Sequence, residues 1–176
     1  MRVSSIAWLR WPRDCAVLGL LLLSGGMSVS ASVEIANPSH AGFTVTADEE
    51  KVQIKAPSGT ASTISDETYP GRAHPGPIIC SFDPFDTWVA VFIPDKQATE
   101  IHVYELKRGK QLQQKATPLS AYPDWYENAH AAYDEPTTWK GNTLRILTRV
   151  TLRPTGEVRE LHQSLTIAGD FFILKP

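Results

Sequence analysis

The stretch "GNTLRILTRVTLRPTGEVRELHQSLTI", residues 141–167, decides the fold class of this chain. Every second residue from Leu144 to Leu152 is apolar or small and lies on one face, while two arginines between them lie on the other. This period of two is typical of a β-strand with one buried and one solvated face. The first half of the stretch is therefore predicted to be a strand.

A turn and a returning strand follow within the same stretch. Pro154 and the threonine after it suit a type I turn, and Gly156 can take the left-handed conformation that completes a hairpin. The apolar residues from Leu161 to Ile167 keep one phase, whereas Val158 is out of phase. A bulge beside the turn is therefore expected.

Further strands are expected where short β-rich runs alternate with turn residues. They cover residues 42–47, 51–56, 60–64, 78–82, 87–93, 99–106 and 170–175. The run at 87–93 is almost continuously apolar, which favours a central strand covered on both faces. The preceding "DPFD", residues 83–86, is interpreted as a turn whose aspartates bond nearby backbone amides, rather than as a catalytic pair of carboxylates.

The pattern of elements predicts an all-β fold, either an antiparallel β-sandwich or a small β-barrel, because many short strands are joined by hairpin turns. Residues 117–139 depart from this alternation of short strands and turns. A short helix is expected near residues 123–132, with Pro123 at its first position and Pro136 as its stop. A chain of about 145 residues can build one full core and not two, so residues 32–176 are expected to form a single all-β domain.

The N-terminal residues follow the order of a secretory signal peptide. Three arginines precede "AVLGLLLLSGGMSVSAS", residues 16–32, in which a short apolar run is followed by small residues. A helix needs roughly 20 apolar residues to cross a bilayer, so no permanent membrane anchor is expected. A buried N-terminal helix is the alternative, but Gly25 and Gly26 would interrupt it. We expect cleavage after Ala31, which makes residues 1–31 the signal peptide and the mature chain secreted or periplasmic.

The charge of the mature chain argues against a polyanionic partner. Removing the signal peptide takes away three basic residues and one acidic residue, which leaves a net charge of about −4. Basic residues are scattered, and the one cluster, Lys107, Arg108 and Lys110, falls in an expected turn. Nucleic acid is therefore not an expected partner.

Motifs for catalysis, metal binding or phosphate binding are missing from the sequence. The histidines, His40, His74, His102, His130 and His162, have no metal-ligand spacing. His130 follows Glu127 by three residues, which on a helix would place both on one face, able to share a cation. Cys80 is flanked by apolar residues and is interpreted as a small buried hydrophobe. No catalytic residue, metal site or cofactor is assigned.

Aromatic side chains with polar tips gather between residues 122 and 139, and such side chains suit a wet binding surface or the mouth of a pocket. The expected ligand-binding residues are Tyr122, Trp125, Tyr126, His130 and Trp139, followed by Arg72 and His74 of the loop at 69–77. Alternatively, the same aromatic residues cap the open end of a sheet structure.

These features predict an exported accessory or binding domain without catalysis, which holds a small apolar or aromatic ligand. One alternative is an interaction module that docks on an envelope protein through an edge strand or a loop. Another, from a different class, is a small metal-dependent hydrolase that uses His130, Glu127 and carboxylates such as Asp83.

Overall fold

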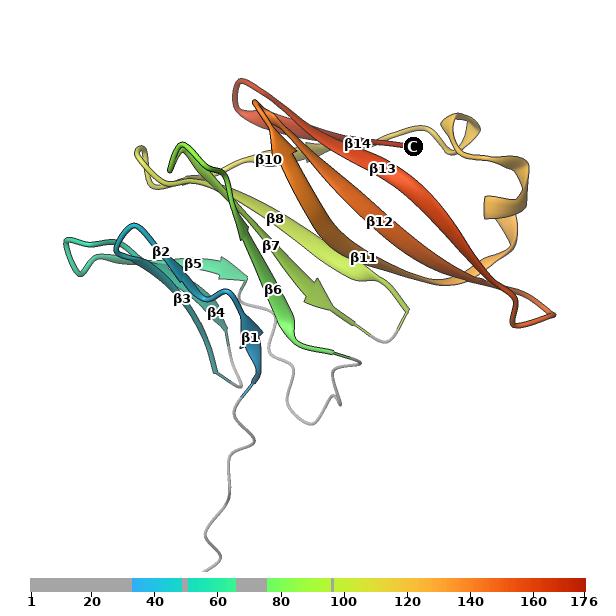
Figure 1. The fold of residues 1–176 in the computed structure, drawn as a ribbon, viewed down its shortest axis with the longest axis horizontal. Helices are drawn as coiled ribbons and strands as arrows, with labels where there is room; N and C mark the ends of the chain where they lie inside the picture. The colour runs from blue at the N-terminus through green and yellow to red at the C-terminus, as the bar shows by residue number, and fades with distance from the viewer. Residues whose placement is uncertain (1–32, 49–50, 66–75, 96) are drawn as a thin grey trace, which may run out of the picture. The chain divides into compact units, whose positions relative to one another are not determined.

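The computed structural model describes residues 33–48, 51–65, 76–95 and 97–176, which belong to one compact unit (Figure 1). The predicted all-β fold class is confirmed, because three sheets pack as a sandwich-like fold and the helical elements are 3-10 turns. The expected signal peptide, residues 1–31, lies outside the described residues.

One five-stranded sheet carries the centre of the fold. Its strands, in order across the sheet, are β1 (Ile35–Ala36), β6 (Ile78–Phe82), β7 (Trp88–Pro94), β8 (Thr99–Glu105) and β9 (Lys110–Gln111). The strands from β6 to β9 pair in antiparallel fashion, whereas β1 pairs with β6 in parallel.

The second five-stranded sheet contains the hairpin from which the fold was predicted. Its strands, in order, are β10 (Gln113–Lys115), β14 (Phe171–Lys175), β13 (Val158–Ala168), β12 (Thr143–Leu152) and β11 (Ala129–Lys140). The pairing of β10 with β14 is parallel, so the expected antiparallel arrangement holds for all but two strand pairs among the described residues.

The third sheet is a four-stranded antiparallel meander. Its strands are β2 (Ser39–His40), β3 (Phe43–Ala47), β4 (Val52–Lys55) and β5 (Ala61–Ser65). The expected alternation along the two middle strands is confirmed, because Val45, Val52 and Ile54 are buried while their polar neighbours face outward.

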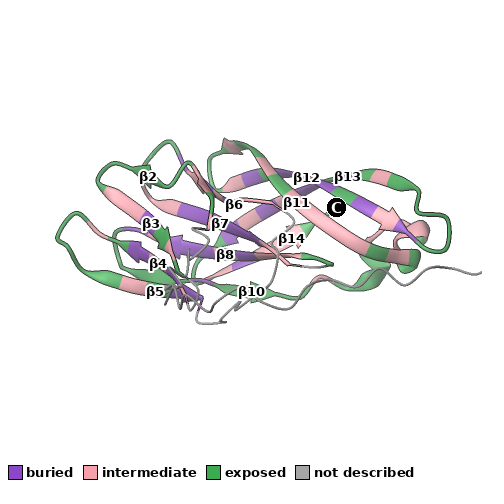
Figure 2. Ribbon diagram, turned by 90° about the horizontal axis from the view of Figure 1, so that it is seen from below, coloured by how far each residue is buried: buried purple, intermediate pink, exposed green. Residues whose placement is uncertain are grey.

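Strand β7 is the central strand that its apolar sequence predicts, with every residue from Val89 to Ile93 buried (Figure 2). Val89, Val91 and Ile93 pack in a cluster with residues of the meander sheet. Ala90 and Phe92 pack in a second cluster with residues of β12, β13 and β14. The buried side chains therefore form two clusters, one on each face of β7, because successive residues of a strand face opposite sides of the sheet.

The hairpin of β12 and β13 differs from the prediction in one detail. Its register runs unbroken from the Thr143–Thr166 pair to the Thr151–Val158 pair, so the expected bulge beside the turn is wrong. Val158 instead faces solvent, which explains its phase. Gly156 has a φ of 71°, the left-handed conformation expected for the turn.

The expected helix near residues 123–132 is also wrong in type and extent. The segment contains two 3-10 turns, η1 (Leu119–Ala121) and η2 (Asp124–Asn128), and Ala129 begins strand β11. β11 pairs along its length with β12, and this tertiary pairing overrides the local helical signal. Pro136 lies within β11, where it is tolerated because β11 is an edge strand with a register shift next to the proline.

Candidate functional site

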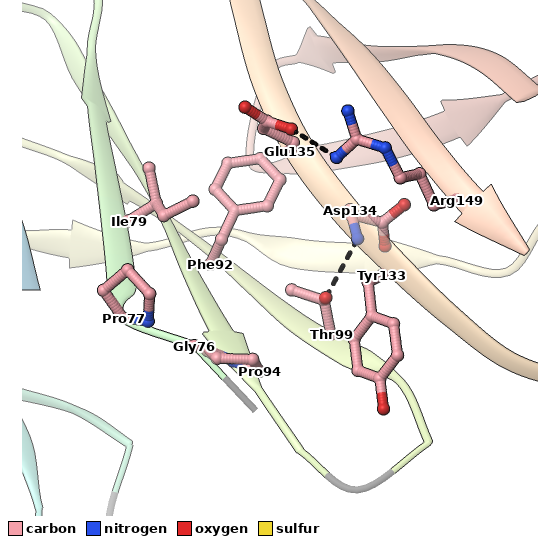
Figure 3. Close-up of a pocket in the computed structure, with 10 residues that line it drawn as sticks. All are labelled: Gly76, Pro77, Ile79, Phe92, Pro94, Thr99, Tyr133, Asp134, Glu135 and Arg149. Atoms are coloured by element: carbon pink, nitrogen blue, oxygen red, sulfur yellow. Dashed lines mark hydrogen bonds and ion pairs between the residues drawn. The ribbon is translucent and has the colours of Figure 1, made fainter. Parts of the chain in front are cut away.

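A pocket of about 230 Å³ lies where strands β6, β7 and β8 approach the edge strand β11 (Figure 3). Residues of β6, β7, β8, β11 and β12 line it, together with two residues that precede β6. Its lining residues are Gly76, Pro77, Ile79, Phe92, Pro94, Thr99, Tyr133, Asp134, Glu135 and Arg149.

The apolar side of the pocket comes from the central sheet. Ile79 on β6 and Phe92 on β7 are register partners, so their side chains lie together on one face of that sheet. Pro77 and Pro94 extend this surface at the strand ends, and Tyr133 of β11 adds an aromatic ring. A concave surface of this kind favours a ligand that leaves water with an apolar or aromatic group.

The polar side of the pocket is built on β11 and β12. Arg149 Nη1 lies 2.8 Å from Glu135 Oε2, and its Nε lies 3.7 Å from Glu160 Oε1. All three side chains are about half exposed, so these ion pairs contribute little to stability. Arg149 and Glu135 line the pocket and give this side its charged groups.

Hydrogen bonds join the start of β8 to the edge strand β11 beside the pocket. The Asp134 amide donates to Thr99 Oγ1 at 3.0 Å, and the Ala132 amide donates to the Gln97 carbonyl at 2.8 Å. A bridge between Ala98 and Ala132 lies between these two bonds. These contacts join the sheet that contains β8 to the sheet that contains β11, and the pocket lies beside them.

Asp134 is the titratable group of the site with the most strongly altered environment. Burial raises the pKa of its carboxyl from 3.8 to about 6, and the hydrogen bond from the Thr148 hydroxyl, at 2.5 Å, opposes part of that rise. Figure 3 shows the Asp134 backbone amide turned toward Thr99. A carboxyl of this kind changes charge at mildly acidic pH.

Three of the residues expected to bind a ligand lie together. The Tyr122 and Tyr126 rings stack at 4.5 Å between centroids, and Trp125 lies 6.1 Å from Tyr126. The Arg159 guanidinium sits 5.4 Å from the Trp125 ring, a cation–π contact made within the chain. These aromatic residues lie beside the β11–β12–β13 sheet, since η2 contacts β12. The alternative expected from the sequence, in which the aromatic residues cap a sheet, describes an arrangement of this kind.

His130 and Trp139 stand apart from that group. They occupy opposite ends of β11, and the His130 Nδ1 atom accepts a hydrogen bond from Arg153 Nε at 3.0 Å. Because His130 lies on a strand and Glu127 in a 3-10 turn, the helical face on which they were to share a cation does not exist.

Trp139 has a packing role at its end of β11. Its ring stacks at 6.5 Å on Trp88, its Nε1 donates to Ser81 Oγ at 3.1 Å, and it packs against the second core cluster. Arg72 and His74 belong to residues 66–75, outside the described residues. Ligand binding by the residues expected from the sequence stays a prediction.

The pocket-lining residues were not expected from the sequence. Tyr133 lies within the aromatic segment at 122–139, and this segment is the one feature of the sequence that indicates a residue of the pocket. Ile79, Phe92 and Thr99 looked like ordinary strand residues, because only the pairing of β8 with the edge of β11 brings them beside Tyr133.

Two residues weighed for chemistry have structural roles. Asp83 is fully buried and accepts hydrogen bonds from the backbone amides of its own turn, which confirms the interpretation of "DPFD" as a turn. Cys80 is a buried free cysteine, and burial raises the pKa of its thiol to about 12, so it carries no reactive thiolate.

Groups of three or more histidine, cysteine or acidic side chains placed to hold a metal ion do not occur within the described ranges. In the same part of the chain, neither 3-10 turn has the length or apolar character needed to cross a bilayer. No protein family model matches the chain, and neither a curated protein nor a solved structure is significantly similar to it.

Proposed function

We propose that this protein is an exported, non-catalytic binding domain whose pocket between β6–β8 and β11 holds a small apolar or aromatic molecule. The observation that carries the proposal is the pocket itself, with Ile79 and Phe92 on one side, Tyr133 on the other, and charged residues at the rim. The signal-peptide pattern of residues 1–31 supports export, in the periplasm or outside the cell.

The size of the pocket limits the ligand. Its volume of about 230 Å³ lies below the roughly 300–1,000 Å³ of sites for drug-sized molecules. A single aromatic ring or a short aliphatic chain fits such a space, with a polar substituent toward Arg149 and Glu135. The pocket is preferred to the Tyr122–Trp125–Tyr126 group because those rings stack on one another and on Arg159.

Native mass spectrometry of the purified chain with indole and with p-cresol tests the proposal, with glucose as a polar comparison. We expect one equivalent of an aromatic compound to bind and glucose not to bind, because the apolar side of the pocket offers sugar hydroxyls no partners. The Ile79→Phe variant should lose at least tenfold in affinity, since the added bulk occupies the pocket.

Ile173→Phe is the matched control, because Ile173 is also a half-buried strand residue but lies on β14 and does not line this pocket. It should bind the aromatic compound as the unaltered chain does. Equal loss in both variants, or no binding of either aromatic compound to the unaltered chain, would count against the pocket as a ligand site.

A second candidate function, docking on an envelope protein, has one observation in its favour. Phe85 is 70% exposed at the tip of the turn between β6 and β7, and Asp83 holds that turn through backbone hydrogen bonds. An aromatic side chain on a rigid turn is typical of interface anchors. A protein without small-molecule binding, which captures one envelope protein and loses it on Phe85→Ser substitution, would support this candidate instead.

A further inference from the structure

A second pocket, of about 220 Å³, is lined by residues of the meander sheet and by the end of β8 with the turn that follows it. We call it the meander pocket. Strands β3, β4 and β5 each contribute a residue, and the turn at 106–109 contributes four. It shares no lining residue with the pocket beside β11, so a ligand of one pocket is recognised by different side chains from a ligand of the other.

The apolar part of the meander pocket consists of buried side chains. Ile54, Tyr104 and Leu106 are at most 5% exposed, belong to the first core cluster and line the pocket. The half-buried Phe43 adds a second aromatic ring. A ligand with a small apolar body, such as one aromatic ring, gains by leaving water for this surface.

The Tyr104 hydroxyl is a buried donor at the wall of the meander pocket. Tyr104 is 5% exposed, and its hydroxyl has no hydrogen-bond partner among the residues that the structure describes. A Cβ atom at Gly109, which also lines the pocket, would lie 3.3 Å from the Tyr104 oxygen, so the glycine leaves this hydroxyl uncovered. Because buried polar groups in proteins are nearly always hydrogen-bonded, the hydroxyl indicates that an acceptor binds in the pocket.

The charged residues that line the meander pocket are both basic, Lys107 and Arg108. Arg108 already bonds Glu105 and lies 3.4 Å from Asp170. Lys107 is exposed and forms no ion pair within the described part of the chain, so its ammonium group is free to pair with a bound anion. A pocket with charges of one sign attracts ligands of the opposite sign.

Hydroxyl groups of the meander sheet add further donors. Thr60 and Ser62 line the pocket, and Thr60 Oγ1 accepts a hydrogen bond from Ser58 at 3.1 Å, which leaves the Thr60 proton for another acceptor. An ionised carboxylate only accepts hydrogen bonds and has room for several donors. A single unpaired lysine balances one negative charge, which favours a carboxylate over a doubly charged phosphate.

We propose that the meander pocket binds a small monocarboxylate with an apolar body. The body lies against Phe43, Ile54 and Leu106, while the carboxylate accepts a hydrogen bond from the Tyr104 hydroxyl and pairs with Lys107. This site adds an anionic ligand to the neutral one proposed for the pocket beside β11, and neither site requires the other.

Titration of the ¹⁵N-labelled full chain with sodium benzoate at neutral pH, followed by amide chemical shifts, tests the proposal. We expect saturable shifts centred on Ser62, Leu106 and Gly109. Benzamide has the same ring and a similar size but no charge, so it should bind at least about tenfold more weakly, because hydrogen bonds to a charged acceptor are the stronger ones.

Two substitutions identify the groups that hold the carboxylate. Tyr104→Phe removes the hydroxyl alone and should weaken benzoate binding by at least about tenfold. It should not lower the stability of the chain, since that hydroxyl has no partner in the described structure, whereas a purely structural hydroxyl would show the reverse. Lys107→Gln should weaken binding by about two- to fivefold, as expected for an exposed ion pair.

Two control variants separate this site from its surroundings. Lys110→Gln removes a nearby cation that pairs with Asp170 and does not line the pocket, and Ile79→Phe fills the pocket beside β11. Both should bind benzoate as the unaltered chain does. The proposal is overturned if benzoate does not bind, if benzamide binds equally well, if Tyr104→Phe binds unchanged, if the two lysine variants behave alike, or if Ile79→Phe abolishes binding.

Discussion

Replacing Asp83 with alanine is expected to lower the free energy of unfolding by about 3–5 kcal/mol, because it leaves three part-buried backbone amides without their acceptor and removes a fully buried side chain from the turn. The Asp83 carboxylate is fully buried and accepts from the amides of Phe85 at 3.0 Å, Thr87 at 2.6 Å and Trp88 at 2.5 Å. Hydrogen bonds to a charged acceptor are stronger than neutral ones, and alanine supplies none of them. Urea denaturation followed by circular dichroism measures the change.

Asp86→Asn is the control for this experiment. Asp86 lies in the same turn with a φ of 53°, a conformation that asparagine tolerates, and its ion pair with His40 is about half exposed. Loss of this contact in Asp86→Asn should lower the free energy of unfolding by less than about 1 kcal/mol. If the two substitutions had similar effects, Asp83 would not be the residue that organises the turn.

Replacing Phe172 with alanine is expected to have an effect of the same size, about 3–5 kcal/mol, through loss of packing in the second core cluster. Phe172 is 1% exposed and packs in the cluster that contains Phe92 and Leu144. The neighbouring Phe171 is half-buried on the other face of β14, with Lys115 Nζ 3.3 Å from its ring centroid. Phe171→Ala should therefore lower stability by only about 1 kcal/mol.

The comparison of these two adjacent phenylalanines, by urea denaturation, tests the placement of the core. A larger loss from Phe171→Ala than from Phe172→Ala would mean that β14 presents its opposite face to the second cluster, and the register of the β13–β14 pair would then be wrong.

The strands could be predicted wherever the sequence alternates cleanly or is continuously apolar. The β12–β13 hairpin, β7 and the six other predicted strands all lie where expected, because burial of one or both faces is recorded in the local pattern. β11 was missed, since "AHAAYDEPTTWK" contains residues with weak strand preference and becomes a strand through its pairing with β12. The very short strands β1, β2, β9 and β10 carry too few residues for any period to show.

The candidate pocket could not be predicted, for a different reason. Its residues come from five strands and from the two residues before β6, and the arrangement depends on β8 reaching the edge of β11 through bonds such as that of Asp134 to Thr99. Neither strand's own sequence encodes that approach. The aromatic segment includes Tyr133, which lines the pocket, but it separates into the Tyr122–Tyr126 group, Tyr133 at the pocket and Trp139 beside the second core cluster.

The most direct test of the binding function is a titration of the ¹⁵N-labelled chain with p-cresol, followed by amide chemical shifts in NMR spectra. The proposal predicts that the saturable shifts centre on Ile79, Phe92, Thr99 and Tyr133, the residues that line the pocket. Saturable shifts confined to Trp125 and its neighbours in residues 117–128, with none at these four positions, would contradict it.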